Sequence, residues 1–283
     1  MTATGERRVL LSGLGFAEGP RWHEDRLWFS DMGTARVMAV DLKGRAQEMA
    51  EVPQRPSGLG WLPDGSLLIV SMGDRRVLRL VGGTLEVHAD LSGLVSFDCN
   101  DMVVDGRGQA YVGNAGFDLR DRPLRPRPAE LVLVTPTGEA SVVDDQLVFP
   151  NGAVVSPDGE TLIVAETFGQ RLTAFTIGED GSLSRRRTFA SLPGHAPDGI
   201  CLDAEGAVWF ADATGQACVR VREGGEVVDR VDVGRGCFAC ALGGEGRRTL
   251  FILTAEGYSG PAIRSRTGAI ETFTVDVPGA GWP

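Results

Sequence analysis

One pattern recurs along the whole chain: a cluster of turn-forming residues followed by a short run of β-branched or aromatic residues. The six copies read RWHEDRLWFSD from Arg21, WLPDGSLLIVS from Trp61, MVVDGRGQAYVGN from Met102, VVSPDGETLIVAE from Val154, CLDAEGAVWFAD from Cys201 and ALGGEGRRTLFILTA from Ala241. They are spaced about 40 to 50 residues apart, which is the period of propeller blades. Each copy is typical of a hairpin, with an apolar strand, an Asp/Gly turn and a second apolar strand.

Two further strands fit between successive copies, for example in ARVMAVDLKG and AQEMAEV. Four strands per unit and six units predict an all-β fold: a six-bladed β-propeller with four antiparallel strands per blade, forming a single domain over residues 1–283. No segment of ten or more residues has the 3.6-residue apolar stripe of a crossover helix. A β-sandwich, the structural alternative, would not produce six copies in phase. The segment RRVLLSG is expected to complete the last blade and close the ring.

The repeat also predicts which residues meet at the centre. The first strand of each blade lines the central channel, and its N-terminal end opens on one face. These strands begin in AEGPRW, RPSGLGW, DCNDMVV, FPNGAVV, APDGICL and FACAL. The residues at the equivalent position, called the ring residues below, are Glu18, Ser57, Asn100, Asn151, Asp198 and Phe238.

Four of the ring residues carry oxygen donors, which apolar strands do not otherwise use. Two carboxylates and two carboxamides that converge on an axis suit one hard divalent cation. Because no Cys or His is among them, the set favours Ca²⁺, with Mg²⁺ or Mn²⁺ next, over a thiolate Zn²⁺ site. A different interpretation of Glu18-Gly-Pro, Asn151-Gly and Asp198-Gly is that they are turn residues. Their common phase in the repeat favours the ligand hypothesis.

The composition of the chain argues against several classes of binding partner. With 28 basic and 38 acidic residues, the net charge is −10, which argues against binding to nucleic acid or to an anionic membrane. No apolar run approaches the ~18 residues of a membrane span, and MTATGERRVL lacks the apolar stretch of a signal peptide. Five cysteines do not suggest a secreted disulfide scaffold. We therefore expect a cytoplasmic protein, a monomer or weak homo-oligomer, that acts on a small molecule.

The motifs EGPRW, ND near Asn100, PNG at Asn151 and PDG at Asp198 resemble the senescence marker protein/gluconolactonase/luciferin-regenerating family, and the likeness covers essentially the whole chain. The resemblance implies a six-bladed propeller with one catalytic divalent metal, and hydrolysis of sugar lactones as the usual activity. It also implies that Glu18, Asn151 and Asp198 are the metal ligands. Asn100 would bind substrate or act as a fourth ligand.

One position departs from the family. Its regucalcin-like sugar lactonases carry an arginine two residues before the position that matches Asn100, where it contacts the substrate. Here that residue is Asp98, in SFDCND. Asp98 therefore argues against a simple aldonolactone as the substrate.

The chemistry can be stated from the residues. A divalent cation in the channel would polarise the carbonyl of a lactone and activate a water molecule for ring opening. Asp198 is the family-type general base, and Asp101 is the adjacent alternative. A carboxylate on a cation is a weak base, so we expect the cation to carry much of the activation of the water.

A second set of residues follows each hairpin on the same face: Asp31, Ser71, Asn114, Glu166, Asp212 and Ala255. Its three carboxylates either orient the ligands or are polar loop starts. The longest interruption, residues 114–130, carries Arg120, Arg122, Arg125 and Arg127. It is either a lid that attracts an anionic substrate or a solvated proline-rich loop. Phe117 is expected to form a wall of the pocket. His195 is either a proton shuttle near the rim or an ordinary loop histidine.

Three classes of function remain. The favoured one is a metal-dependent lactonase. The second is a phosphotriesterase-like hydrolase, similar to diisopropyl fluorophosphatase, which would use the same cation on a P=O centre. The third is a non-catalytic calcium-binding propeller that presents a face to a protein partner. A scaffold does not require acids that converge on its axis, so the ring residues favour the first two.

Overall fold

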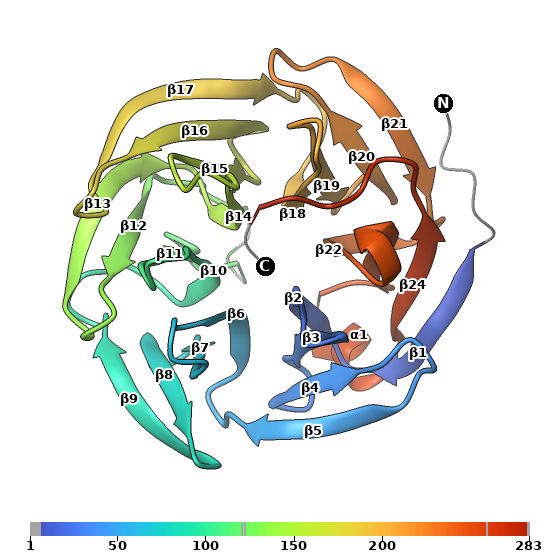
Figure 1. Ribbon diagram of the computed structural model, residues 1–283, viewed down its shortest axis with the longest axis horizontal. Helices are drawn as coiled ribbons and strands as arrows, with labels where there is room; N and C mark the ends of the chain where they lie inside the picture. Colours follow the sequence, from blue (N-terminus) through green and yellow to red (C-terminus); the bar gives the residue numbers. More distant parts are fainter. Residues whose placement is uncertain (1–6, 120, 122, 259, 282–283) are drawn as a thin grey trace.

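The computed structural model describes residues 7–119, 121, 123–258 and 260–281. Six four-stranded antiparallel sheets stand radially around a central axis, which confirms the predicted six-bladed β-propeller (Figure 1). The innermost strand of each blade contacts the innermost strands of the two neighbouring blades. The six inner strands therefore form a closed ring around the axis.

Five blades take four consecutive strands each. The first contains β2 (Ala17–His23), β3 (Arg26–Asp31), β4 (Arg36–Val40) and β5 (Ala46–Glu51). The second contains β6 (Pro56–Trp61), β7 (Leu67–Ser71), β8 (Arg76–Val81) and β9 (Thr84–Asp90). The third contains β10 (Cys99–Val104), β11 (Ala110–Asn114), β12 (Ala129–Val134) and β13 (Ala140–Leu147). The fourth contains β14 (Pro150–Val155), β15 (Thr161–Glu166), β16 (Arg171–Ile177) and β17 (Leu183–Ser191). The fifth contains β18 (Pro197–Leu202), β19 (Val208–Asp212), β20 (Ala217–Val221) and β21 (Val227–Asp232).

The sixth blade joins the two ends of the chain. It contains β22 (Gly236–Gly243), β23 (Thr249–Ala255) and β24 (Gly268–Thr274), and its outermost strand is β1 (Arg8–Leu14). Arg8 pairs with Thr272 and Leu14 with Gly268, so the expected closure by the RRVLLSG segment is confirmed. Two short helices, η1 (Glu245–Arg247) and α1 (Gly260–Arg264), interrupt this blade. Among the described residues no helix is long and apolar enough to span a membrane.

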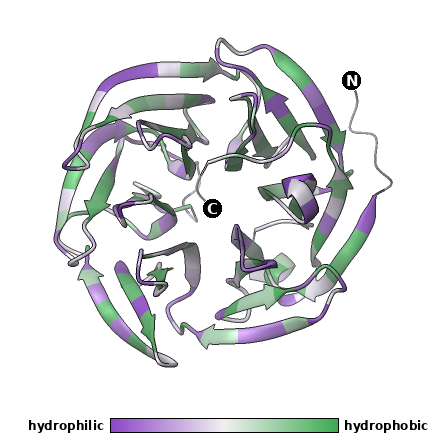
Figure 2. Cartoon of the chain, in the orientation of Figure 1, coloured by the Kyte–Doolittle hydropathy of each residue, from purple (hydrophilic) through white to green (hydrophobic). Residues whose placement is uncertain are grey.

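The core lies between neighbouring blades. Leu68 and Val70 of the second blade pack with Val104 and Val112 of the third, and similar apolar clusters join the other blades. Inner strands are buried on both faces, as in β14, whereas the outermost strands, such as β17, are mostly exposed. Hydrophilic and hydrophobic residues both lie along these outermost strands (Figure 2). The apolar runs of the repeat are therefore strands covered on both sides, and the more polar segments between them are the outer edges of the blades.

Glycines let the inner strands approach one another. A Cβ atom at Gly58 would lie 2.3 Å from the backbone nitrogen of Met102, and one at Gly152 would lie 2.6 Å from that of Ile200. At Gly199 it would lie 2.7 Å from the Cα atom of Ala239. The Asn-Gly and Asp-Gly pairs thus lie inside strands rather than in turns, and their glycines serve close packing.

Candidate functional site

The ring residues occupy equivalent places in the fold. Glu18, Asn100, Asn151 and Asp198 are each the second residue of an inner strand, and Ser57 has the same position in β6. In all six blades the pairing register with the next strand shifts around this residue, as at a β-bulge. Bulges re-aim side chains at the ends of strands and are common beside active sites. The same local irregularity therefore sets the direction of the side chain at all six ring positions.

The two carboxylates among the ring residues are both buried, and each lies near another acidic side chain. Glu18 is 9% exposed and Asp198 is 8% exposed. Burial, and next the negative charge of Asp198, raise the pKa of Glu18 well above its ordinary value. Burial, and next the charge of Asp101, raise the pKa of Asp198, although a hydrogen bond from Asn151 opposes this shift. The site thus brings two acidic side chains together in a place that lacks bulk water.

The amide of Asn151 is oriented by a residue that the sequence analysis missed. Asn151 Nδ2 donates to Thr167 Oγ1 at 3.1 Å, and that hydroxyl donates to the carbonyl oxygen of Pro197 at 2.8 Å. Because the amide nitrogen is engaged in this way, Oδ1 is the atom that Asn151 offers to a cation. Asn100 is half-buried, and its Oδ1 lies 3.5 Å from Ser57 Oγ.

The donor set fits a hard cation. In the part of the chain that the structure describes, no three His, Cys, Asp or Glu side chains come together closely enough to hold a metal ion. A cation at the ring would therefore rely on amide oxygens in addition to the carboxylates of Glu18 and Asp198. Carboxylate and amide oxygens are the ligands that Ca²⁺ and Mg²⁺ prefer.

Asp101 has a partner that the sequence did not reveal. It lies in the position that glycine or alanine takes after all five other ring residues, and it is buried. Arg21 Nη2 lies 3.2 Å from Asp101 Oδ1, and the same guanidinium donates to the carbonyl oxygens of Pro20 and Met102. Burial raises the pKa of Asp101, while the charge and hydrogen bond of Arg21 oppose that shift. Asp101 is thus one half of a buried ion pair.

Three carboxylates hold the loops that lead into the strands of Glu18, Asn151 and Asp198. Asp31 accepts the backbone N–H groups of Phe16 at 2.9 Å and Gly15 at 3.1 Å. Glu166 accepts that of Val148 at 2.8 Å, and Asp212 accepts that of Ala196 at 3.1 Å. Ser71 and Ala255 take the equivalent place in the blades of Ser57 and Phe238. The carboxylates accompany those three blades, which supports an orienting role over that of plain loop starts.

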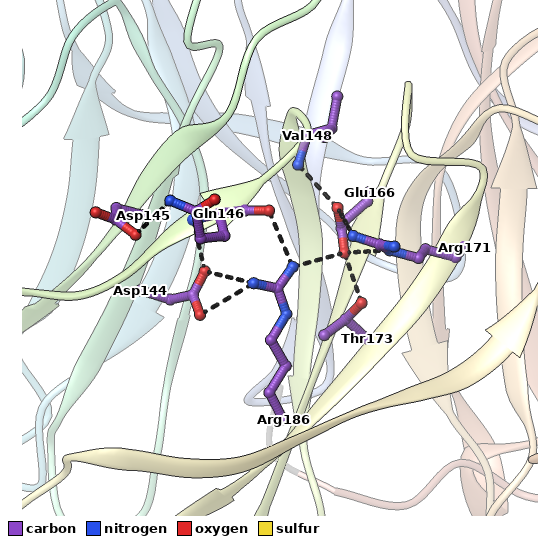
Figure 3. Close-up of polar contacts among 8 residues, drawn as sticks. All are labelled: Asp144, Asp145, Gln146, Val148, Glu166, Arg171, Thr173 and Arg186. Carbon is purple, nitrogen blue, oxygen red and sulfur yellow. Dashed lines mark hydrogen bonds and ion pairs between the residues drawn. The ribbon is translucent and has the colours of Figure 1, made fainter.

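Glu166 is the most heavily engaged of the three (Figure 3). Its side chain is fully buried and accepts hydrogen bonds from Arg171 Nε at 2.7 Å, Arg171 Nη2 at 3.0 Å and Thr173 Oγ1 at 2.5 Å. Arg186 Nη2 lies 3.7 Å from Glu166 Oε1, and Arg186 also pairs with Asp144. The hydrogen bonds from Arg171 to Glu166 raise the pKa of that arginine. This network fixes the loop before Asn151.

His195 forms a dyad with a buried acid. Its Nδ1 lies 2.6 Å from Asp212 Oδ2, its ring stands edge-on to Phe210, and its side chain is 29% exposed. Although burial raises it, the hydrogen bonds from His195 and Ala196 bring the pKa of Asp212 below its ordinary value. An ionised Asp212 holds the proton of His195 on Nδ1 and leaves Nε2 as an acceptor.

The other expected substrate contacts lie around the rim. Asp98 Oδ2 lies 2.6 Å from Arg55 Nη2. An arginine from the preceding blade therefore forms an ion pair with Asp98. Phe117 is buried beneath the rim beside Phe149 and Phe168. Arg120 and Arg122 lie outside the described residues, and Arg125 and Arg127 are exposed.

Comparisons with known proteins show the family and the fold of the chain. The family described as "SMP-30/Gluconolactonase/LRE-like region" matches residues 16–256. The chain is 27% identical to the pentonolactonase XacC of Haloferax volcanii, over 100% of this chain and 97% of the relative. It is 26% identical to the 6-deoxy-6-sulfogluconolactonase of Pseudomonas putida, over 94% and 93%. A solved luciferin-regenerating enzyme shares the fold with a TM-score of 0.85 at 18% identity, covering 98% of both chains.

Proposed function

Because the chain belongs to the SMP-30/gluconolactonase/LRE-like family, we propose that it hydrolyses lactones with a divalent cation bound where the inner strands begin. Two of its relatives are named as lactonases. The observation that carries the proposal is the burial of Glu18 beside Asp198 in a ring that also holds two amide side chains. Burying two like charges costs free energy unless a cation compensates for them, so this placement favours a cation site.

Four side chains would hold the cation. Glu18 and Asp198 supply charge, Asn151 supplies Oδ1, and Asn100 completes the set or faces the substrate. Bound there, a divalent cation would polarise the carbonyl of the lactone and make a water molecule more acidic. Ca²⁺ is the preferred ion for such oxygens, with Mg²⁺ and Mn²⁺ next.

The ion pair between Arg21 and Asp101 sets the charge of the site. With Asp101 neutralised by Arg21, the carboxylates of Glu18 and Asp198 leave two negative charges at the ring, which matches one divalent cation. Asp101 is therefore a charge-balancing residue in our proposal, and its carboxylate is occupied by Arg21.

We assign proton transfer to His195. It lies on the loop that leads into the strand of Asp198, and Asp212 fixes its tautomer. Nε2 would take a proton from the attacking water and return it to the ring oxygen as the ester bond breaks, so that lactone and water become a hydroxy acid. Asp198 is the alternative base, but the bound cation would weaken it.

The test is acid release from a panel of lactones, followed in a pH-stat. Protein stripped with a chelator is compared with the same protein given Ca²⁺, Mg²⁺, Mn²⁺ or Zn²⁺. The proposal expects loss of activity on stripping and recovery with one or two of these ions. Full activity after stripping would contradict it. So would tight binding of a cation that restores no lactone hydrolysis, and phosphotriesters would then be tested in the same assay.

A further inference from the structure

Three phenylalanines gather beside Asn151. Phe149 lies on the loop two residues before it, and Phe168 follows Thr167, whose hydroxyl accepts a hydrogen bond from the Asn151 amide. Phe117 comes from the loop after β11 in the neighbouring blade. The ring centroid of Phe168 lies 5.3 Å from that of Phe117 and 5.5 Å from that of Phe149, both edge-on. Edge-to-face contacts of this kind are favourable and orient the rings.

Only one of the three rings faces solvent. Phe168 is 36% exposed, whereas Phe117 is 2% exposed and Phe149 is 7% exposed. The two buried rings therefore support the exposed one, so that it presents a fixed apolar surface next to a candidate cation ligand. Phe149 has a φ of 60°, a left-handed conformation that is strained for an aromatic residue. Strain of this kind persists where the surrounding structure holds it, often at ligand sites.

The side of the site at the second and third blades is different. There the guanidinium of Arg55 is paired with Asp98 at 2.6 Å. A substrate hydroxyl placed against Phe168, the exposed ring beside Asn151, would find no group on that ring that can accept or donate a hydrogen bond. Burying unpaired hydroxyls is costly, whereas an alkyl or aryl group gains from the same contact.

We infer that the substrate is a lactone that carries an apolar substituent, alkyl or aryl, and that this substituent packs on Phe168. The inference rests on the proposed function and deepens it by naming the substrate class. Phe168 is the specificity-determining contact, and Phe117 and Phe149 position it.

The experiment compares three δ-lactones: the unsubstituted ring, the ring with a phenyl or hexyl group, and glucono-δ-lactone. Wild-type protein, Phe168→Ala, Phe168→Leu and Val87→Ala are assayed with the cation that supports activity. Val87 is 56% exposed on β9, the outermost strand of the second blade, and its variant controls for loss of an exposed apolar side chain. Circular dichroism and melting temperatures establish that each variant is folded.

We expect the wild type to prefer the substituted lactone over both others. Phe168→Ala should lower kcat/KM for the substituted lactone about tenfold, mainly through KM, which is the usual size of the effect of losing a small apolar contact. Phe168→Leu should retain most of the preference, and the unsubstituted ring should respond little to either change. Val87→Ala should behave as the wild type.

Two results would overturn the inference while leaving the lactonase proposal intact. One is a preference for glucono-δ-lactone, and the other is an equal effect of Phe168→Ala on the substituted and unsubstituted rings. Failure of the wild type to hydrolyse any lactone with any cation would instead refute the proposed function, and this inference with it.

Discussion

Replacing Glu166 by Gln tests whether the loop carboxylates support the site. The substitution keeps the shape of a fully buried side chain but removes its charge, while its partners are the backbone of Val148, the hydroxyl of Thr173 and the guanidinium of Arg171. A glutamine has one acceptor oxygen, so its amide group must face one of these donors. Hydrogen bonds to charged groups are worth about 1.5–3 kcal/mol each, and the substitution weakens two of those that Glu166 accepts.

The partial exposure of Arg171 reduces the loss of stability. The Arg171 side chain is 35% exposed, so water can solvate part of its released charge. We therefore expect Glu166→Gln to lower the free energy of unfolding by about 3 kcal/mol, at the low end for a broken buried ion pair. For a chain of this length, that corresponds to a fall in Tm of roughly 6 °C.

Urea unfolding followed by tryptophan fluorescence measures this change, and a chelator-competition titration measures Ca²⁺ affinity. Loosening the loop before Asn151 should weaken Ca²⁺ binding about tenfold, the lower end of what partners behind metal ligands contribute. Asp158→Asn is the control, because Asp158 is a turn carboxylate that asparagine can replace. It should change stability by less than about 0.5 kcal/mol.

A stability loss for Glu166→Gln no larger than that of Asp158→Asn would refute the energetic reasoning. A large stability loss with unchanged Ca²⁺ affinity would refute the orienting role alone.

Three further outcomes are expected. Folding raises the pKa values of Glu18 and Asp198, so their protonated forms favour the folded state. The cation-free protein should therefore lose stability as the pH rises from the ordinary carboxyl range near about 4 through the raised pKa values. In thermal scans, the rise in Tm on adding Ca²⁺ should therefore grow as the pH increases above the ordinary carboxyl range near about 4. A pH-independent rise would contradict this. Arg21→Met should lower the free energy of unfolding in urea by about 3–5 kcal/mol, because it leaves Asp101 unpaired. Adding Asp101→Asn to this variant should recover most of the loss. Equal losses in the single and double variants would argue against the ion pair. His195→Gln should lower kcat about 10²-fold or more with little change in KM and remove one limb of the pH–rate profile, and an unaltered profile would exclude its role as a base.

The repeat predicted the fold because its signals are local. Each Asp/Gly turn between two apolar runs specifies a hairpin without reference to distant residues, and six hairpins in phase leave few alternatives to a propeller. The same phase brought Glu18, Asn151 and Asp198 to equivalent positions, although they come from three different blades. Periodicity thus located these residues before any contact was known.

Contacts between blades could not be read in this way. Arg21 and Asp101 are separated by 80 positions and meet because β2 and β10 both border β6. The pairing of Arg55 with Asp98 and the hydroxyl bridge of Thr167 also join neighbouring blades. Such pairs depend on which side chain reaches across the ring, and a pattern within one blade carries no information about that. The glycines after the ring residues were the one available signal, since they are needed where inner strands approach closely.

The central claim is that one cation, held by residues of at least three blades, supports lactone hydrolysis. The most direct test measures Ca²⁺ affinity and lactone turnover on the same samples of wild type, Glu18→Gln, Asn151→Ala and Asp198→Ala, with folding checked by circular dichroism. The claim predicts that affinity and turnover fall together in all three folded variants, and that turnover is abolished in Asp198→Ala. Turnover near the wild-type level in folded Asp198→Ala would contradict it.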